Sequence, residues 1–229
     1  ERGRTKILRN LDWRIAPGSL LEAEFESSRQ SQPSVPGFSL LGNRVPPPSD
    51  PSINLNNQPW SEPVVFGANT GSIRYTQAID ANWRWSARLM GQRLRTDDRT
   101  AFPFGCSAEG NYDRFCSDGS FDMYDYRSDD ERRDSSAAEL AVNGSVATGG
   151  VQHTLGFGVL ATRFKSRFQR NAYNYVGSGN IDGSVMLPAD PTLNYENTNR
   201  DERSTELFVH DAMQVGERMR LWLGLRYTW

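Results

Sequence analysis

Residues 206–229 read ELFVHDAMQVGERMRLWLGLRYTW, and they give the clearest secondary-structure signal in the chain. Apolar side chains occupy every second position of the second half: Met219, Leu221, Leu223, Leu225 and Tyr227. Most residues between them are polar or small. This alternation is typical of a β-strand with one apolar and one polar face. Because Val215-Gly216-Glu217 can form a tight turn between two such strands, the stretch is predicted to be a β-hairpin.

The same pattern recurs in three earlier parts of the chain. Each part has two alternating segments joined by a tight turn, and the four turns centre near residues 17, 81, 149 and 216. In the first hairpin, Glu22, Glu24 and Glu26 share one face of a strand whose other face is apolar. Three carboxylates on one face require water. The sequence therefore predicts an all-β fold of eight antiparallel strands in four hairpins, with a solvated surface or lumen on one side.

Long connections separate the predicted hairpins, covering roughly residues 30–70, 96–134 and 167–202. They are rich in Pro, Asn, Ser, Asp and aromatic residues. Short turns at one edge and long loops at the other are the layout of a transmembrane β-barrel, with periplasmic turns and extracellular loops. A soluble β-sandwich is the alternative, but its turn signals come at closer intervals.

Composition sets limits on function. The 26 Lys and Arg residues nearly balance 28 Asp and Glu residues, and a net charge of −2 excludes a chain-wide basic surface for nucleic acid. The longest apolar run, Leu155 to Ala161, is too short for a transmembrane helix. The mean hydropathy of −0.65 does not exclude a membrane barrel. Polar lumen positions and polar loops lower the average and hide the apolar faces of the strands.

The last hairpin closely resembles TonB-dependent outer-membrane receptors, especially the ferric-siderophore branch. In that family, a strand with Phe-x-x-Asp is followed by a short turn and a strand ending Gly-x-Arg-Tyr. Phe208, Asp211, Gly224, Arg226 and Tyr227 occupy these places here. About two dozen residues match sharply, and the rest of the chain matches only in hairpin layout. His210 departs from the Gln common in the family.

The resemblance implies the fold and the partners. It implies a 22-stranded barrel with an N-terminal plug, of which residues 1–229 would be a partial β-barrel domain that lacks the plug and the remaining strands. The strand directions also place both chain ends outside the cell, as expected for an internal piece of a larger barrel. The expected function is import of ferric siderophores through the bacterial outer membrane, energised by the TonB complex through the plug. The expected partners are the ferric siderophore, TonB and outer-membrane lipid, without nucleic acid.

Several candidate site residues follow. Gly224 and Arg226 share the face opposite the leucines, so they are expected to face the lumen and the plug. Cys106 and Cys116 are expected to form a disulfide in an oxidising compartment. Loop aromatics could stack on a siderophore, with arginine neighbours attracting its charge. The predicted ligand-binding residues are Tyr112, Phe121, Tyr124, Tyr126, Tyr173, Tyr175 and Tyr195. Neither a cofactor nor a protein-bound metal is expected, because the siderophore supplies the iron's donor atoms.

Another porin-like barrel is one alternative function, and an outer-membrane barrel enzyme is the alternative from another functional class. Only His153 and His210 could act as histidine bases. His210 and Asp211 are adjacent in a strand, so their side chains point to opposite faces and do not form a dyad. Neither histidine has an obvious catalytic partner in the sequence. No catalytic residue is therefore predicted, and transport is favoured over catalysis.

Overall fold

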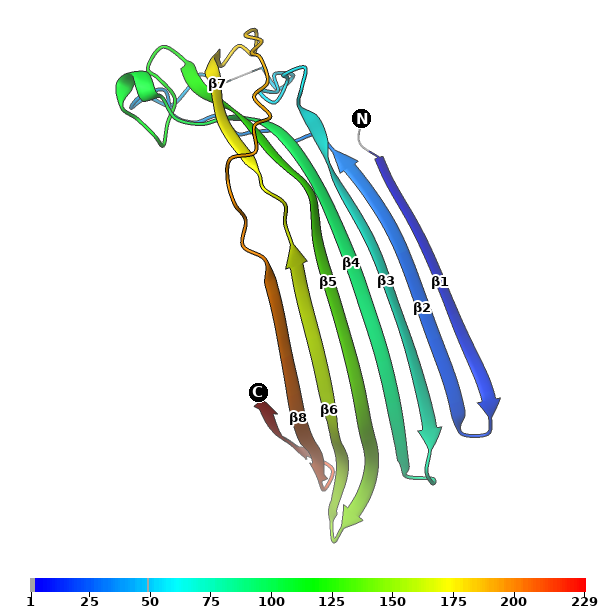
Figure 1. Cartoon of the computed structure of the whole chain (residues 1–229). Helices are drawn as coiled ribbons and strands as arrows, with labels where there is room; N and C mark the ends of the chain where they lie inside the picture. The colour runs from blue at the N-terminus through cyan, green and yellow to red at the C-terminus, as the bar shows by residue number, and fades with distance from the viewer. Residues whose placement is uncertain (1–2, 49) are drawn as a thin grey trace.

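The computed structural model describes residues 3–48 and 50–229, which form essentially one antiparallel sheet (Figure 1). Its strands are β1 (Gly3–Ala16), β2 (Ser19–Gln32), β3 (Glu62–Ala78), β4 (Trp83–Pro103), β5 (Ser120–Thr148), β6 (Val151–Arg167), β7 (Ala172–Asn180), β8 (Arg200–Val215) and β9 (Met219–Thr228). A short 3-10 helix, Ser107–Glu109, follows β4. The order in the sheet is β1-β2-β3-β4-β5-β6-β8-β9, and β7 pairs with the upper part of β5.

The four predicted hairpins are confirmed. They are β1–β2, β3–β4, β5–β6 and β8–β9, and the two strands of each hairpin are antiparallel. Gly18 and Gly149 stand in two of the turns with φ values of +77° and +60°. This left-handed conformation is easily reached only by glycine, so these residues allow the chain to reverse within two positions.

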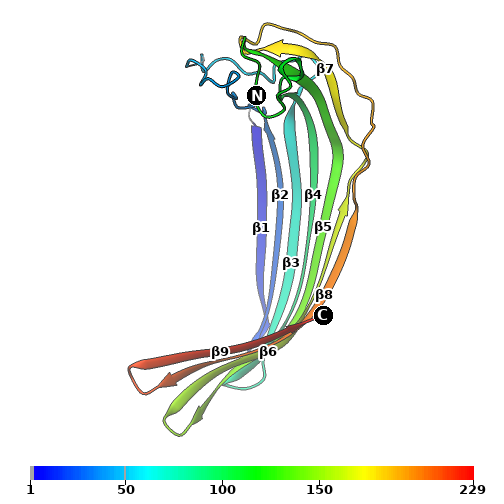
Figure 2. The same cartoon turned by 90° about the vertical axis from the view of Figure 1, so that its left-hand side faces the viewer.

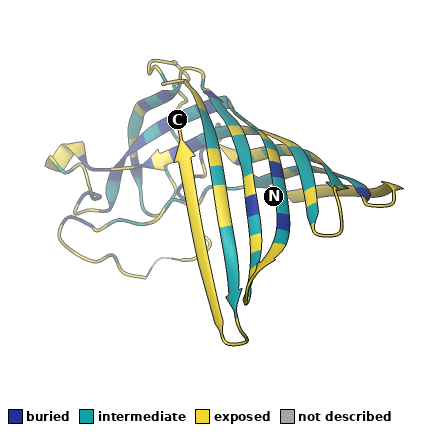
Figure 3. Cartoon of the chain, turned by 90° about the horizontal axis from the view of Figure 1, so that it is seen from below, coloured by how far each residue is buried: buried dark blue, intermediate teal, exposed yellow. Residues whose placement is uncertain are grey.

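The sheet is twisted and unclosed. The direction of the strands rotates strongly between β1 and β9 (Figure 2), as the right-handed twist of β-strands requires. β1 and β9 each pair with one neighbour, and their residues are exposed along the full length of each strand (Figure 3 for β9). Two such edges need further strands, because unpaired backbone groups promote aggregation.

The structure corrects two of the predicted connections. Much of residues 96–134 is strand rather than loop, since β4 extends to Pro103 and β5 begins at Ser120. The third connection, predicted over 167–202, contains β7, a strand that the sequence did not predict. The described residues therefore form nine strands instead of the predicted eight. With 29 residues, β5 is roughly 95 Å long at ~3.3 Å per residue. It is far longer than the ~9–11 residues that cross a bilayer, so the paired end of β4 and start of β5 stand well above the membrane zone.

Opposite charges face each other in this extended part. Arg99 contacts Asp129 at 3.0 Å, and Arg93 contacts Asp134 at 2.7 Å. Both faces of these strands are polar or mixed, which removes the alternation that marks a strand in the sequence. This explains why the charged run 125–134 was predicted as a loop.

A small hydrophobic core joins the three long connections; we call this unit the outer cap. Its buried members are Leu41, Leu55, Ala101, Phe115, Phe121 and Met123. Side chains of the first connection also bond to the backbone of the third. The Trp60 indole donates to the Leu187 carbonyl at 3.1 Å, and Gln58 donates to the Val185 carbonyl at 2.9 Å. The three connections therefore pack as one unit.

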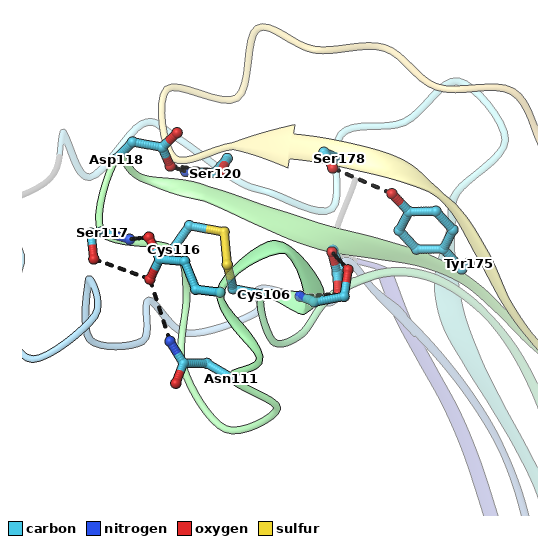
Figure 4. Close-up of a disulfide and its surroundings, with 11 residues drawn as sticks. Cys106, Asn111, Cys116, Ser117, Asp118, Ser120, Tyr175 and Ser178 are labelled. Atoms are coloured by element: carbon cyan, nitrogen blue, oxygen red, sulfur yellow. Dashed lines mark hydrogen bonds between the residues drawn. A yellow bond between two sulfur atoms is a disulfide. The ribbon is translucent and has the colours of Figure 1, made fainter.

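The predicted disulfide between Cys106 and Cys116 is present (Figure 4). Both cysteines are buried, with Cα atoms 5.1 Å apart. The backbone N–H of Asn111 donates to the Cys106 carbonyl at 2.9 Å. The disulfide therefore closes a compact loop at the edge of the outer cap.

Replacing both cysteines with serine should loosen this loop. Closing a loop of about ten residues stabilises a fold by ~2–3 kcal/mol in the chain-entropy description, so limited proteolysis between residues 106 and 116 should become faster. Reduction of the wild-type protein should reproduce the effect, and reduction of the double variant should change nothing. Equal cleavage of oxidised wild type and double variant would contradict this role.

Candidate functional site: the inner wall above the membrane zone

Strand register assigns each side chain to one of two faces. Residues paired across neighbouring strands share a face, and alternation carries that face along each strand. One row across the eight wall strands is Trp13, Leu21, Tyr75, Ala87, Leu140, Val159, Leu207 and Tyr227. Its members are apolar or aromatic, as a lipid-facing surface requires. We call this the outer face.

The opposite surface is the inner face. The row next to the previous one contains Glu22, Arg74, Arg88 and Glu139 on four consecutive strands. Arg74 donates two hydrogen bonds of 2.6 Å to the two oxygens of Glu22. Charges in this pattern are typical of a solvated barrel lumen.

The inner face continues above the membrane zone. Alternation along β4 leads from Arg88 through Gln92 to Asp98, Thr100 and Phe102. In β5, Tyr126 is paired with Thr100 and Tyr124 with Phe102. β7 then brings Tyr173 opposite Tyr126 and Tyr175 opposite Tyr124. Three strands thus bring aromatic rings to one part of the inner wall.

Four of the predicted ligand-binding residues form a cluster there; we call Tyr124, Tyr126, Tyr173 and Tyr175 the tyrosine cluster. The rings of Tyr124 and Tyr173 are stacked, with centroids 4.5 Å apart and an interplanar angle of 5°. Tyr126 and Tyr175 meet this pair edge-on, at centroid distances of 6.4 Å from Tyr173 and 6.0 Å from Tyr124. Such contacts fix the rings in place and leave planar surfaces for a ligand.

A hollow of about 620 Å³ lies beside the tyrosine cluster. Gln32, the last residue of β2, and residues 33–36 line one side. The other lining residues are Asp98, Thr100, Phe102, Tyr126 and Tyr173. Its size falls within the ~300–1,000 Å³ range of small-molecule sites. Aromatic walls with a few polar groups are also typical of such sites.

Burial and nearby charges raise the pKa of two acidic side chains that line the hollow. Burial raises the pKa of Tyr173 to about 12. Burial also raises the pKa of the Asp98 carboxyl, and the nearby carboxylates Glu131 and Asp129 raise it further, against the hydrogen bond from Thr100. That bond measures 2.6 Å from the Thr100 hydroxyl to Asp98 Oδ1. The hollow is therefore an electronegative, partly desolvated environment.

The other three predicted ligand-binding residues do not line the hollow. Tyr112 is 70% exposed in the connection between the two cysteines, and Tyr195 forms an isolated bridge with Asn171. Phe121 is 1% exposed and packs against Phe115 with ring centroids 4.8 Å apart. Phe121 thus belongs to the core of the outer cap and has almost no free surface for a ligand.

Gly224 and Arg226 lie on the inner face. Gly224 pairs with His210, and Arg226 pairs with Phe208. The Arg226 Nε atom is 3.2 Å from a carboxylate oxygen of Glu206, while the Arg226 side chain stays 68% exposed. The arginine is oriented by its neighbour and keeps donors free toward the inside of the wall.

The structure brings one histidine to an acid that sequence reasoning did not pair with it. His153 Nδ1 lies 2.7 Å from Asp211 Oδ2, across the β6–β8 ladder. Sequence alone could not find this pair, because it depends on the register of two strands separated by a long connection. Both residues lie on the outer face: Asp211 is paired with Leu155, and His153 is paired with Met213. Among the described residues, no serine hydroxyl bonds to either histidine, so the geometry does not form a hydrolytic triad.

Residues 3–48 and 50–229 contain neither a metal-binding cluster nor a membrane-spanning helix. Within these ranges, no group of three or more His, Cys, Asp or Glu residues could hold a metal ion. No helix there is long and apolar enough to span a membrane. Asp98 and Thr100 also line the hollow. The sequence prediction rests on loop aromatics, so it does not reach these two polar side chains.

The family description "TonB dependent receptor-like, beta-barrel" matches residues 11–229. The match covers nearly the whole chain, so the protein belongs to the TonB-dependent receptor-like β-barrel family. The inner face therefore lines a barrel lumen, and the all-β barrel fold predicted from the last hairpin is confirmed. No curated protein matches the chain.

Solved structures agree on the fold. The ferric-catecholate import receptor Fiu from E. coli K12, in a closed form, matches with a TM-score of 0.79 and 17% identity over 98% of this chain. The ferripyoverdine receptor of the outer membrane of Pseudomonas aeruginosa matches with a TM-score of 0.75 and 15% identity over 99% of this chain. The siderophore receptor PiuA from Acinetobacter baumannii matches with a TM-score of 0.66 and 13% identity over 98% of this chain. The chain spans 34%, 30% and 35% of those three proteins, about a third of each.

These relatives are receptors. The family and the similar structures thus agree with the prediction of a transport receptor over an enzyme. At these identities the likeness concerns the fold, and any shared cargo requires separate support.

Proposed function

We propose that this chain is the wall segment of an outer-membrane receptor that imports ferric siderophores, with energy delivered through TonB. The observation that supports this most is the tyrosine cluster on the inner face of a family barrel, above the membrane zone. A cargo arriving from outside would meet this wall before it reached the plug. The similar structures include receptors for ferric catecholate and ferripyoverdine, which favours a ferric chelate over other cargo.

The site's role would be binding and orientation, without chemistry on the cargo. Ring faces of the tyrosine cluster offer stacking surface to the planar or apolar parts of a siderophore. The chelator holds the iron, so no protein donor atoms are required. We further propose that Gly224 and Arg226 face the plug, since glycine permits close approach and the exposed guanidinium can bond to plug carboxylates or carbonyls.

Uptake of radioactive iron as ferric siderophore tests the function. A strain that lacks the full-length gene should lose uptake of at least one ferric siderophore, and the restored gene should return it. The same loss should follow when TonB is removed. Normal uptake of every ferric siderophore tried in the deletion strain would overturn the proposed cargo.

Tyr173→Ala in the full-length receptor should weaken binding of the ferric siderophore by roughly tenfold. The tyrosine stacks on Tyr124 and lines the hollow, and each aromatic pair contributes ~0.5–1.5 kcal/mol beyond area burial. Tyr227→Ala is the matched control, because Tyr227 lies on the outer face and does not line the hollow. Tryptophan fluorescence quenching by the ferric chelate measures both affinities. An unchanged affinity in Tyr173→Ala would remove the cluster from the binding site.

A further inference from the structure

The lining of the hollow has an unusual charge balance for a receptor of iron chelates. Among the described residues that line it, Asp98 is the one charged side chain, and no Lys or Arg is present. The expected arginine neighbours are therefore missing from this wall. Arginines on the same strands are already paired: Arg99 with Asp129 and Glu62, Arg127 with Asp125, and Arg133 with Glu131.

Asp98 itself has no cationic partner among the ion pairs of the described residues. Its bonded neighbour is the Thr100 hydroxyl, which in turn lies 3.3 Å from the Ser34 hydroxyl. The rings of Phe102, Tyr126 and Tyr173 line the same hollow as this carboxyl, and the ring centroids of Phe102 and Tyr173 are 6.0 Å apart. Three ring faces and one carboxyl group are the components of an aromatic cage for an organic cation.

We infer that the hollow beside Asp98 binds a cationic group of the cargo, an ammonium or guanidinium, between its aromatic rings. The ring faces attract a cation through their quadrupoles, and the carboxylate supplies the opposite charge. Burial strengthens both interactions because water screens them less. The desolvation and repulsion that raise the pKa of Asp98 would be relieved by a bound cation. A strongly anionic chelate would instead meet carboxylates and electron-rich rings.

This inference rests on the proposed function and narrows it to cargo that bears a positive group. The test uses the full-length receptor and two iron chelates with the same metal-binding groups. One is a linear ferric trihydroxamate with a free terminal ammonium. The other is its N-acetylated form, which has no charge. A ferric tris-catecholate serves as the anionic comparison.

The receptor should bind the ammonium form at least about tenfold more tightly than the acetylated form. Asp98→Asn keeps the shape of the side chain and should bring the ratio close to one. Tyr173→Leu should lower the ratio as well, through loss of a ring face. Asp113→Asn is the matched control, since Asp113 is exposed, lies in the connection between the cysteines and does not line the hollow. It should keep the wild-type ratio.

The outcomes separate the two proposals. Three results would each overturn the cationic site and leave siderophore binding intact. They are equal affinity for the two trihydroxamates, tighter binding of the tris-catecholate, and an unchanged affinity ratio in a folded Asp98→Asn receptor. Binding of none of the three chelates, together with normal iron uptake in the deletion strain, would overturn the proposed function and this inference with it.

Discussion

Leu11→Arg should reduce the yield of folded receptor in the outer membrane more than any other surface change considered. Leu11 lies on the outer face, where it is paired with Ala23 and 54% exposed. An arginine on the lipid face of a barrel costs ~2–4 kcal/mol near the bilayer midplane. The folded fraction can be measured by heat-modifiable migration of the full-length receptor and by urea unfolding in lipid vesicles.

The neighbouring residue provides the matched control. Asn10 is on the inner face and is paired with Glu24. Asn10→Arg adds the same side chain to the same strand, but in the lumen and opposite a carboxylate. Its unfolding free energy should stay within about 0.5 kcal/mol of the wild-type value. Equal destabilisation by the two variants would contradict the assignment of the faces.

Phe121→Ala should destabilise the outer cap by ~3–5 kcal/mol. The side chain is 1% exposed and contacts Phe115 in the core that joins the three connections. Its removal leaves a cavity that the disulfide-closed loop cannot easily fill. Hydrogen exchange in residues 38–60 and 104–123 should become faster, whereas exchange in the membrane-zone parts of β1–β4 should not change.

Phe66→Ala is the comparison variant, because Phe66 is 43% exposed and is not part of that core. It should leave exchange in the outer cap unchanged. If Phe121→Ala weakened siderophore binding without faster exchange, Phe121 would be a contact residue after all. If hydrogen exchange in the outer cap became faster in Phe121→Ala and stayed at the wild-type rate in Phe66→Ala, Phe121 would have a structural role in the outer cap.

The sequence predicted the parts of the fold in which each strand has one apolar face and one solvated, polar face. Leu221, Leu223 and Leu225 alternate with polar or small neighbours, so both the strand and its lipid-facing side could be read directly. The same signal failed above the membrane zone. There β4 and β5 have polar or mixed residues on both faces, and pairs such as Arg93 with Asp134 become visible only once the register is known.

Side-chain type predicted the site only in part. Aromatic residues in outer segments include the four that form the tyrosine cluster, but composition could not separate Tyr124 from Phe121. These residues are three positions apart, and alternation places them on opposite faces of β5. One face meets the hollow and the other meets the outer cap. Asp98 had no sequence signal, because its importance comes from rings contributed by β5 and β7.

The outer cap also limits how such a receptor can be re-engineered. Residues from all three connections share one core, and Trp60 and Gln58 bond to the backbone of residues 185–187. A single connection grafted from a relative would therefore arrive without its packing partners and expose apolar surface. Chimeric receptors with altered cargo preference should fold only when the three connections are exchanged together.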